Sequence, residues 1–423
     1  MTLLTVLILC FIIGVPIGFS LGIAGTFGIM QLGAPLMVVV QRMYSGIDSI
    51  PLIAVLLFTL AGALMLKGGI ATRLVHFSDT LVGHMPGGMA MVTVVGSMFF
   101  GLITGSAIAA TAAIGSIMLP VMIQKGYHKS FAACLCSTSG SIGPILPPSI
   151  PLLVFGVIAN TSIARLFLGG VIPGILMGIA LMILSYILGK KRGYIGREKR
   201  ATRREIFNAF KDAIWALIMP FFIMGGILSG AFTPTESAAV AVAYAILVSV
   251  FIYKELTLRL FVESLFEASK TTGTVLIVVG FASVFTWVIT MMMIPQTIAA
   301  FLADTIQSRF MMLLLINIIL LIVGTSIDTI SCIVIFAPLF LTLAPAFDID
   351  VVHLGVLMAV NLTIGMCTPP LGVCLFVSSN ISGIPLTEMF KDLWQQIIAL
   401  LIVLIIITYM PWTVTWLPNL LIG

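Results

Sequence analysis

Long apolar stretches separated by short polar segments form the main pattern along this chain. Ten apolar runs lie at residues 3–30, 50–66, 88–103, 131–158, 166–189, 213–253, 274–294, 311–323, 352–379 and 395–417. Two shorter runs, 107–123 and 327–345, each lie directly beside a Gly/Ser or Gly/Thr pair. Because a crossing helix needs roughly 20 apolar residues, the pattern predicts an all-α polytopic membrane protein with about ten to twelve transmembrane helices.

Two parts of this pattern recur in the second half of the chain. Gly105-Ser106-Ala107 corresponds to Gly324-Thr325-Ser326, and Pro147-Pro148 corresponds to Pro369-Pro370, at offsets of 219 and 222 residues. Glycine and proline interrupt helices, and paired interruptions in two halves mark binding sites in secondary transporters. We therefore expect two re-entrant helical hairpins, at about 104–124 and 324–345, and two broken helices, at about 129–158 and 352–379.

The composition narrows the class of protein. Hydrophobic residues make up 60% of the chain and charged residues only 8%, against about 25% charged in an average soluble domain, which excludes a water-soluble globular protein. Nine of the 20 basic residues fall within 190–211. Because basic residues concentrate in cytoplasmic loops, we expect a cytoplasmic linker here and no nucleic-acid partner. The linker, 191–212, divides the chain into halves at 1–190 and 213–423.

Charges beside the two hairpins predict how the halves are related. Lys125 and Lys129 follow the first hairpin, whereas Asp348 and Asp350 follow the second without a basic residue near them. The same charge bias places the two hairpin bases on opposite sides of the membrane, which makes the halves inverted repeats. Two amphipathic segments, 203–213 and 256–270, are predicted to be interfacial helices that lie along the membrane.

Polar residues gather at the hairpin tips and at the facing breaks, where backbone groups lose their helical partners. Free carbonyls with Ser, Thr and Asn oxygens suit Na⁺, whereas free N–H groups at positive helix ends suit a carboxylate. The candidate Na⁺ residues are Thr104, Gly105, Ser106, Ser141, Gly143, Gly324, Thr325, Asp328, Gly365 and Thr368. The candidate substrate residues are Ser139, Ser149, Ser326, Asn361 and Thr363. For single hydroxyls the alternative is a hydrogen bond to the i−4 carbonyl of an ordinary helix.

Asp328 is the most informative charged residue, because it directly follows the second tip in a segment, 327–345, that lacks basic residues. A carboxylate at membrane depth is by default a functional candidate, here as a cation ligand or a proton carrier. A hydrogen-bonded structural Asp is the alternative. Glu236 has a sufficient structural explanation in the first turn of a helix capped by Thr233 or Thr235.

Other kinds of chemistry are disfavoured by what the sequence lacks. It contains no HExxH and no GxxxxGK[ST], so neither a zincin-type metal site nor direct ATP hydrolysis is expected. The six cysteines lie in apolar segments without CxxC spacing and are interpreted as small buried hydrophobic residues. No His lies at the depth of Ser141 to activate a serine nucleophile, so the chain is not predicted to be an enzyme. The apolar start, without Lys or Arg before Arg42, indicates a first transmembrane helix rather than a signal peptide.

At these motifs the chain resembles the large membrane subunit of the tripartite ATP-independent periplasmic (TRAP) transporters, the DctM-like family of the ion transporter superfamily. The matching stretches are Gly105-Ser106-Ala107 through Pro120, Gly126-Tyr127, Ile145-Leu146-Pro147-Pro148-Ser149, Gly225-Gly226 through Ala239, Thr368-Pro369-Pro370-Leu371-Gly372, and Phe390 to Pro411. They occur in order and cover essentially the whole chain, which makes the resemblance specific.

The resemblance implies an elevator-type secondary transporter, in which a mobile domain with both hairpins and both broken helices moves against a scaffold. It also implies Na⁺ as the coupling ion, a small four-helix DctQ-like membrane subunit as a separate chain, and a DctP-like periplasmic substrate-binding protein. The family's Na⁺-site roles fall here on Ser106 with Ser141 and Gly143, and on Gly324 and Thr325 with Gly365 and Thr368.

The sequence and the resemblance together lead us to expect a multi-pass protein of the bacterial inner membrane. Its expected activity is Na⁺-coupled import of a small organic anion, a carboxylate or a sulfonate. A stand-alone Na⁺- or H⁺-coupled anion carrier that needs no binding protein remains the alternative. An intramembrane hydrolase would need a Ser/His or paired-Asp site at one depth, and a channel fits two closed hairpin sites less well than alternating access does.

Overall fold

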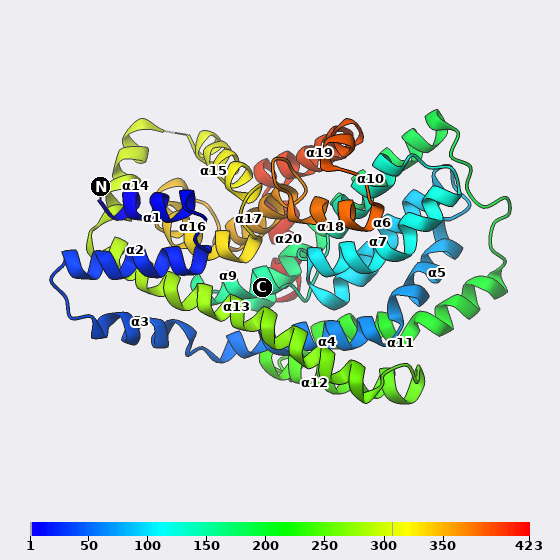
Figure 1. Ribbon diagram of the computed structural model, residues 1–423, viewed down its shortest axis with the longest axis horizontal. Helices are drawn as coiled ribbons and strands as arrows, with labels where there is room; N and C mark the ends of the chain where they lie inside the picture. Colours follow the sequence, from blue (N-terminus) through cyan, green and yellow to red (C-terminus); the bar gives the residue numbers. More distant parts are fainter. Residues whose placement is uncertain (1, 307) are drawn as a thin grey trace.

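The computed structural model describes residues 2–306 and 308–423, and this part of the chain consists of helices and connections without a strand (Figure 1). Eight helical segments in it are long and apolar enough to cross a membrane. The all-α polytopic architecture is therefore confirmed. Fewer long spans are found than the ten to twelve predicted, because Gly and Pro residues divide apolar runs such as 131–158 and 352–379 into shorter helices.

The two halves share the series of elements that includes each hairpin. The first half contains α1 (Thr2–Ile12), α2 (Ile17–Gln31), α3 (Met37–Ile47), α4 (Ile50–Lys67), α5 (Ile70–Val82), α6 (Gly88–Thr104), α7 (Ala107–Gln124), α8 (Lys129–Gly140), α9 (Ile150–Ile158) and α10 (Ile163–Arg192). The second contains α11 (Arg203–Leu228), α12 (Pro234–Leu247), α13 (Leu258–Met291), α14 (Ile294–Thr305), α15 (Arg309–Gly324), α16 (Thr329–Leu343), α17 (Val351–Gly365), α18 (Val373–Ser382), α19 (Leu386–Tyr409) and α20 (Trp412–Leu421). In both, a short helix, a hairpin, a broken helix and a long helix follow one another, as α5–α10 and as α14–α19.

The halves are joined by reciprocal packing. Helix α4 of the first half packs on α12 of the second, and α2 packs on α13, which also lies along α3 and α4 (Figure 1). The same exchange occurs nearer the hairpins, where α7 packs on α18 and α9 packs on α16. Equivalent elements thus make equivalent contacts across the molecule, as expected for a duplicated unit.

The two segments predicted to be interfacial helices are the first parts of long continuous helices. Residues 203–213 form the start of α11, and most of 256–270 forms the start of α13. A capping box at Thr202 and Glu205 begins α11, and no proline occurs before Pro220 to interrupt it. On α11 the predicted apolar side chains Phe207 and Phe210 are exposed, whereas Ala209 and Ala213 are buried, and α11 packs against α5.

Both predicted hairpins are present, but they are longer than expected. The first is α6–α7 and the second is α15–α16, so the ranges 104–124 and 324–345 cover only the tips and the second arms. The first arms begin at Gly88 and Arg309. Their apolar runs, 88–103 and 311–323, have the composition of ordinary membrane helices, which is why the pattern alone did not assign them to the hairpins.

Candidate functional site

The two hairpin tips each begin a helix with a capping side chain. Ser106 Oγ accepts a hydrogen bond of 3.3 Å from the backbone N–H of Ala109 at the start of α7. Asp328 does the same for α16: its Oδ2 accepts from the N–H of Ser331 at 3.0 Å, and its Oδ1 accepts from the Ser331 hydroxyl at 2.5 Å. By its capping role, Asp328 corresponds to Ser106 at an offset of 222 residues, although the sequence comparison matched Ser106 with Thr325.

The two tips line one cavity of about 610 Å³. Four of the predicted residues contribute to its wall: Thr104, Gly105, Ser106 and Asp328. The opposite wall is built by one face of α4 and one face of α13, which turn residues at helical spacing toward the cavity. These residues are Val55, Thr59, Gly62, Ala63 and Leu66 on α4, with Glu267, Lys270, Thr271, Thr274, Val275 and Val278 on α13.

Behind each tip, a hairpin arm touches a helix break through glycine. A Cβ atom added to Gly101 would lie 2.5 Å from the Cα of Gly143, and one added to Gly365 would lie 2.6 Å from the carbonyl carbon of Gly324. No larger residue permits this approach of two backbones. The contact also brings carbonyl oxygens close to Gly143, since those of Ser106 and Gly140 lie 3.2 and 3.3 Å from its Cβ position.

The remaining candidates of the first half lie at the break and not in the cavity wall. Ser139 Oγ pairs with Ser97 Oγ of α6 at 3.0 Å, and Ser141 donates to the carbonyl of Thr138 at 2.7 Å. Ser149 caps α9 by accepting from the N–H of Leu152 at 3.2 Å. Ser139, Ser141, Ser149 and Gly143 are fully enclosed by protein, so their oxygens support the break and have no direct access to the cavity.

In the second half, Asn361 links the break to the hairpin. It is completely buried, and its amide nitrogen donates to the side-chain oxygen of Asn317 on α15 at 2.7 Å and to the Asn317 carbonyl at 3.0 Å. Asn317 in turn donates to Thr408 of α19 at 2.9 Å. Asn361 Oδ1 has no hydrogen-bond partner in the described part of the chain.

The other second-half candidates use their hydroxyls locally, as the helical alternative predicted. Thr325, Thr363 and Thr368 donate to carbonyls three or four residues earlier, at 2.8, 2.9 and 2.8 Å. Ser326 is exposed and lies 3.3 Å from the Thr325 hydroxyl. The backbone at this tip also participates, because the Thr325 carbonyl accepts from the N–H of Gly372 beyond the break at 3.1 Å.

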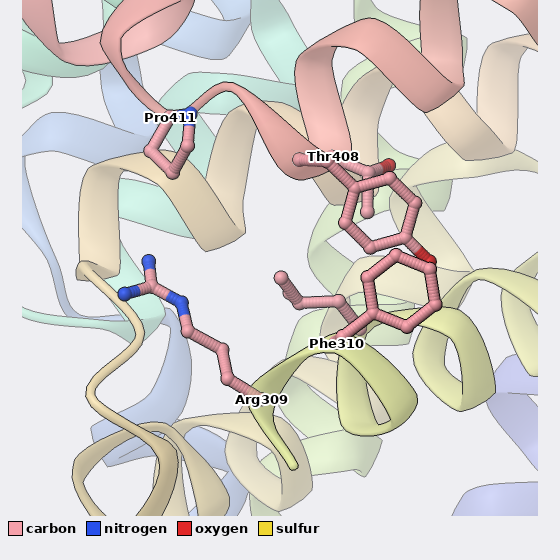
Figure 2. Close-up of a pocket in the computed structure, with 6 residues that line it drawn as sticks. Arg309, Phe310, Thr408 and Pro411 are labelled. Atoms are coloured by element: carbon pink, nitrogen blue, oxygen red, sulfur yellow. The ribbon is translucent and has the colours of Figure 1, made fainter.

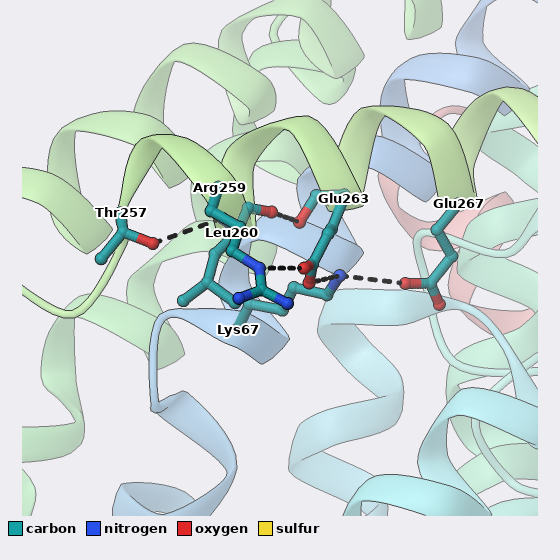
Figure 3. A network of polar contacts seen from close by, with 7 residues as sticks. Lys67, Thr257, Arg259, Leu260, Glu263 and Glu267 are labelled. Carbon is teal, nitrogen blue, oxygen red and sulfur yellow. Dashed lines mark hydrogen bonds and ion pairs between the residues drawn. The ribbon is translucent and has the colours of Figure 1, made fainter.

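Sequence reasoning missed the charged residues that α13 presents to the cavity, Glu267 and Lys270. Figure 3 shows the adjoining ion-pair network, in which Lys67 at the end of α4 reaches Glu263 at 3.4 Å and Glu267 at 3.7 Å. Arg259 pairs with Glu263 from one turn earlier on α13 at 3.0 Å. The sequence did contain a partial sign that these charges lie on a membrane helix. Only Gly273 interrupts the chain between them and the apolar run at 274–294.

Two further features contain none of the predicted binding residues. Glu236 and Thr233 form a capping box at the start of α12, which confirms the structural explanation of that carboxylate. A second cavity of about 270 Å³ lies between α15 and the end of α19, beside the stacked rings of Phe310 and Tyr409 (Figure 2). Its lining is Arg309, Phe310, Leu313, Thr408, Tyr409 and Pro411.

Comparison with known proteins gives close relatives over nearly the whole chain. The chain is 40% identical over 411 residues to the sialic acid TRAP transporter large permease protein SiaM of Vibrio cholerae, covering 97% of this chain and 96% of that one. It is 38% identical to the C4-dicarboxylate TRAP transporter large permease protein DctM of Pseudomonas aeruginosa, with 95% and 94% covered. It is also 39% identical to the isethionate TRAP transporter permease protein DctMQ of Oleidesulfovibrio alaskensis; this match covers 95% of the chain but only 63% of that relative's length.

Among solved structures, the fold is similar to that of the YdaH transporter of Alcanivorax borkumensis. The TM-score is 0.65 at 13% identity, with 88% of this chain and 87% of the other covered. MtrF of Neisseria gonorrhoeae, described as belonging to a class of antimetabolite efflux pumps, gives a TM-score of 0.57 at 13% identity. At such identities the likeness concerns the fold alone.

Residues 4–413 match the family described as "Tripartite ATP-independent periplasmic transporter, DctM component". The chain therefore belongs to the DctM family of large permease subunits of TRAP transporters.

Proposed function

We propose that this permease imports a small organic anion, a carboxylate or a sulfonate, together with Na⁺. The observation that carries the proposal is the shared cavity, at which both hairpin tips begin helices and which α4 and α13 close from the other side. Helix N-termini present free N–H groups and the positive ends of dipoles, and both favour an anion. The N-terminus of α7, capped by the neutral Ser106, would therefore receive the anion, whereas the Asp328 carboxylate at the start of α16 suits Na⁺.

The class of substrate is supported by the relatives. As a member of this family with eight apolar helical segments in its described part, the chain is a multi-pass protein of the bacterial inner membrane. The relatives are named for isethionate, sialic acid and C4-dicarboxylates. Each of these carries a sulfonate or a carboxylate, which suits the helix termini at the cavity. The family description also supports two partners, a small DctQ-like membrane subunit and a DctP-like periplasmic binding protein.

Na⁺ fits the groups at the two glycine contacts. In the first half it would be held by Ser106, Ser141 and Gly143, where the carbonyls of Ser106 and Gly140 come together. In the second half it would be held by Gly324, Thr325, Gly365 and Thr368, where the backbones of Gly324 and Gly365 meet. Neutral carbonyl and hydroxyl oxygens at broken helices suit this ion. In the described residues no cluster of three His, Cys, Asp or Glu side chains is placed for a metal, so these neutral groups are the matching donors.

The same architecture supports an elevator mechanism with inverted repeats. The hairpins and broken helices would form the mobile domain, and α2, α4, α12 and α13 would belong to the scaffold. Reciprocal packing of α4 on α12 and of α2 on α13 favours a scaffold shared by both halves. The cavity lies at the boundary between the two groups of helices, which is where alternating access needs the substrate to be.

Uptake in proteoliposomes tests this proposal. The chain would be reconstituted with its small membrane subunit, and uptake of isethionate, succinate and N-acetylneuraminate would be measured with and without an inward Na⁺ gradient and the periplasmic protein. We expect one of these anions to accumulate only when both are supplied. Uptake without the periplasmic protein would favour the stand-alone carrier, and no dependence on Na⁺ would contradict the coupling.

Proton coupling is the second candidate, because Asp328 places a carboxylate in the cavity wall. Collapse of a proton gradient with an uncoupler, while the Na⁺ gradient is maintained, separates the two ions. We expect uptake to continue under these conditions. Loss of uptake would instead favour a proton carried on the Asp328 carboxylate.

A further inference from the structure

Helix α13 presents a positive charge to the cavity from the wall opposite the hairpin tips. Lys270 lines the cavity together with Glu267, one turn earlier, and with Thr271 and Thr274. All four residues are exposed. The remainder of the α13 wall is apolar, with Val275 and Val278 at the same helical spacing.

Of the three charged side chains in the cavity wall, only Lys270 is without an ionic or hydrogen-bonding partner in the part of the chain that the structure describes. Glu267 lies 3.7 Å from the ammonium of Lys67, and both Asp328 oxygens accept from Ser331. The backbone carbonyl of Lys270 accepts a hydrogen bond from the Thr274 hydroxyl at 3.0 Å, and this bond does not involve the ammonium group. The acidic residues are thus already engaged, whereas the ammonium is available.

Lys270 lies toward the end of the molecule at which the basic linker enters α11. The nearby end of α4, at Lys67, adjoins the connection into α13, where Glu255 pairs with Arg73 of α5 at 2.7 Å. The same connection contacts the start of α11, because Tyr253 donates to the carbonyl of Asp212 at 2.9 Å. The basic linker leads into that end of α11, so Lys270 lies on the side of the cavity expected to face the cytoplasm.

We propose that Lys270 is an anion-receiving group, a positive charge that meets the carboxylate or sulfonate of the substrate as it passes between the hairpin tips and the cytoplasm. This inference rests on the proposed import of an organic anion. A positive charge without a partner raises the local concentration of anions around it. The tips then hold the substrate through helix ends and hydroxyls, and α13 supplies the full positive charge that the tips lack.

Cysteine modification measures this charge without requiring transport. A Thr271→Cys variant of the chain, reconstituted with its small membrane subunit, would be treated with an anionic sulfonatoethyl and a cationic trimethylammonium-ethyl methanethiosulfonate. The native cysteines are all buried, and their background is measured without the added thiol. We expect the anionic reagent to react faster, and Lys270→Gln to lower the anionic-to-cationic rate ratio by roughly tenfold.

Matched variants separate the local charge from a general effect. Lys270→Arg keeps the charge and should keep the ratio, and Lys211→Gln removes an exposed lysine of α11 that lies outside the cavity wall and should also keep it. If Lys270→Gln leaves the anionic-to-cationic rate ratio unchanged, the inference is overturned. An unreactive thiol at Thr271 and also at Thr274 would overturn it as well, because the cavity would then be closed to anions on that side.

Uptake then shows whether the charge is used during transport. For whichever of the three anions is imported, Lys270→Gln should raise the substrate concentration at half-maximal uptake severalfold and leave the Na⁺ dependence unchanged. An unchanged substrate dependence would contradict the role in transport. If none of the anions is imported, the proposed function fails, whereas the rate ratio still reports on Lys270 itself.

Discussion

At the scale of single residues, the two hairpin tips use different side chains for the same structural task. Ser106 and Asp328 both begin a helix by accepting from a backbone N–H three residues later. Ser leaves the first tip neutral, whereas Asp adds a charge at the positive end of α16 in the wall of the cavity. The charge is therefore not needed for capping, which a hydroxyl accomplishes at the equivalent position.

Substitution of Asp328 separates capping from charge. Asn and Ser cap helices about as well as Asp, so Asp328→Asn and Asp328→Ser should retain the thermal stability of the purified protein, whereas Asp328→Ala should lose about 1 kcal/mol. If the carboxylate takes part in coupling, Asp328→Asn should also raise the Na⁺ concentration for half-maximal uptake severalfold. A wild-type Na⁺ titration in the Asn variant would assign Asp328 to capping alone.

At the scale of elements, each hairpin is held against its broken helix by contact between glycines. A Cβ atom on Gly101 would lie 2.5 Å from the Cα of Gly143, and one on Gly365 would lie 2.6 Å from the carbonyl carbon of Gly324, so neither position has space for alanine. In the first half this close approach places the carbonyls of Ser106, at the tip, and Gly140, at the break, 3.2 and 3.3 Å from the Gly143 Cβ position.

Alanine at these glycines should destabilise the protein. Gly101→Ala or Gly365→Ala places a methyl group against backbone that cannot rotate away, at a cost of about 1–3 kcal/mol typical of overpacking. Gly225→Ala in α11 is the matched control, because no atom lies within 4 Å of its Cβ position, and alanine there should be neutral or stabilising by up to about 1 kcal/mol. Thermal unfolding in detergent measures all three; equal stability of the variants would contradict the packing argument.

The sequence was informative where backbone chemistry decides the structure. Glycine beside Ser106 and the Pro-Pro pairs after Gly143 and Gly365 predicted tips and breaks, because these residues cannot continue a helix. Of the cavity wall, only the part formed by the hairpin tips was predicted from the sequence. Its second wall comes from α4 and α13, distant in sequence from the tips, and Lys270 was interpreted as part of an interfacial helix. Contacts between remote segments leave no local pattern, so this wall became visible only in the fold.

At the scale of the whole molecule, the two halves of the chain exchange packing partners. Equivalent pairs recur, α4 on α12 and α2 on α13, then α7 on α18 and α9 on α16. If the halves are inverted, the bases of the two hairpins lie on opposite sides of the membrane. Lys125 and Asp348 mark these two bases, and both are exposed.

Labelling from each side of the membrane tests the inversion. Lys125→Cys is suitable for the first base, but Asp348 has a φ of 51° that strains a new side chain, so Ala346→Cys, which is exposed beside it, is the better position for the second. In intact spheroplasts, an impermeant maleimide should label position 346 and not position 125, and lysis should expose position 125. Labelling of both from the same side would contradict inverted repeats.

Reciprocal packing also constrains how the protein is made. Helix α2 ends at Gln31 and its partner α13 begins at Leu258, so more than 200 residues must be synthesised before the two can meet. At roughly 5–20 residues per second, this interval is about 10 to 45 s. The first half of the scaffold must therefore wait in the bilayer with its partner-binding faces uncovered. Until the second half emerges from the ribosome, lipid or another protein must cover the faces of the first-half helices that later pack on it.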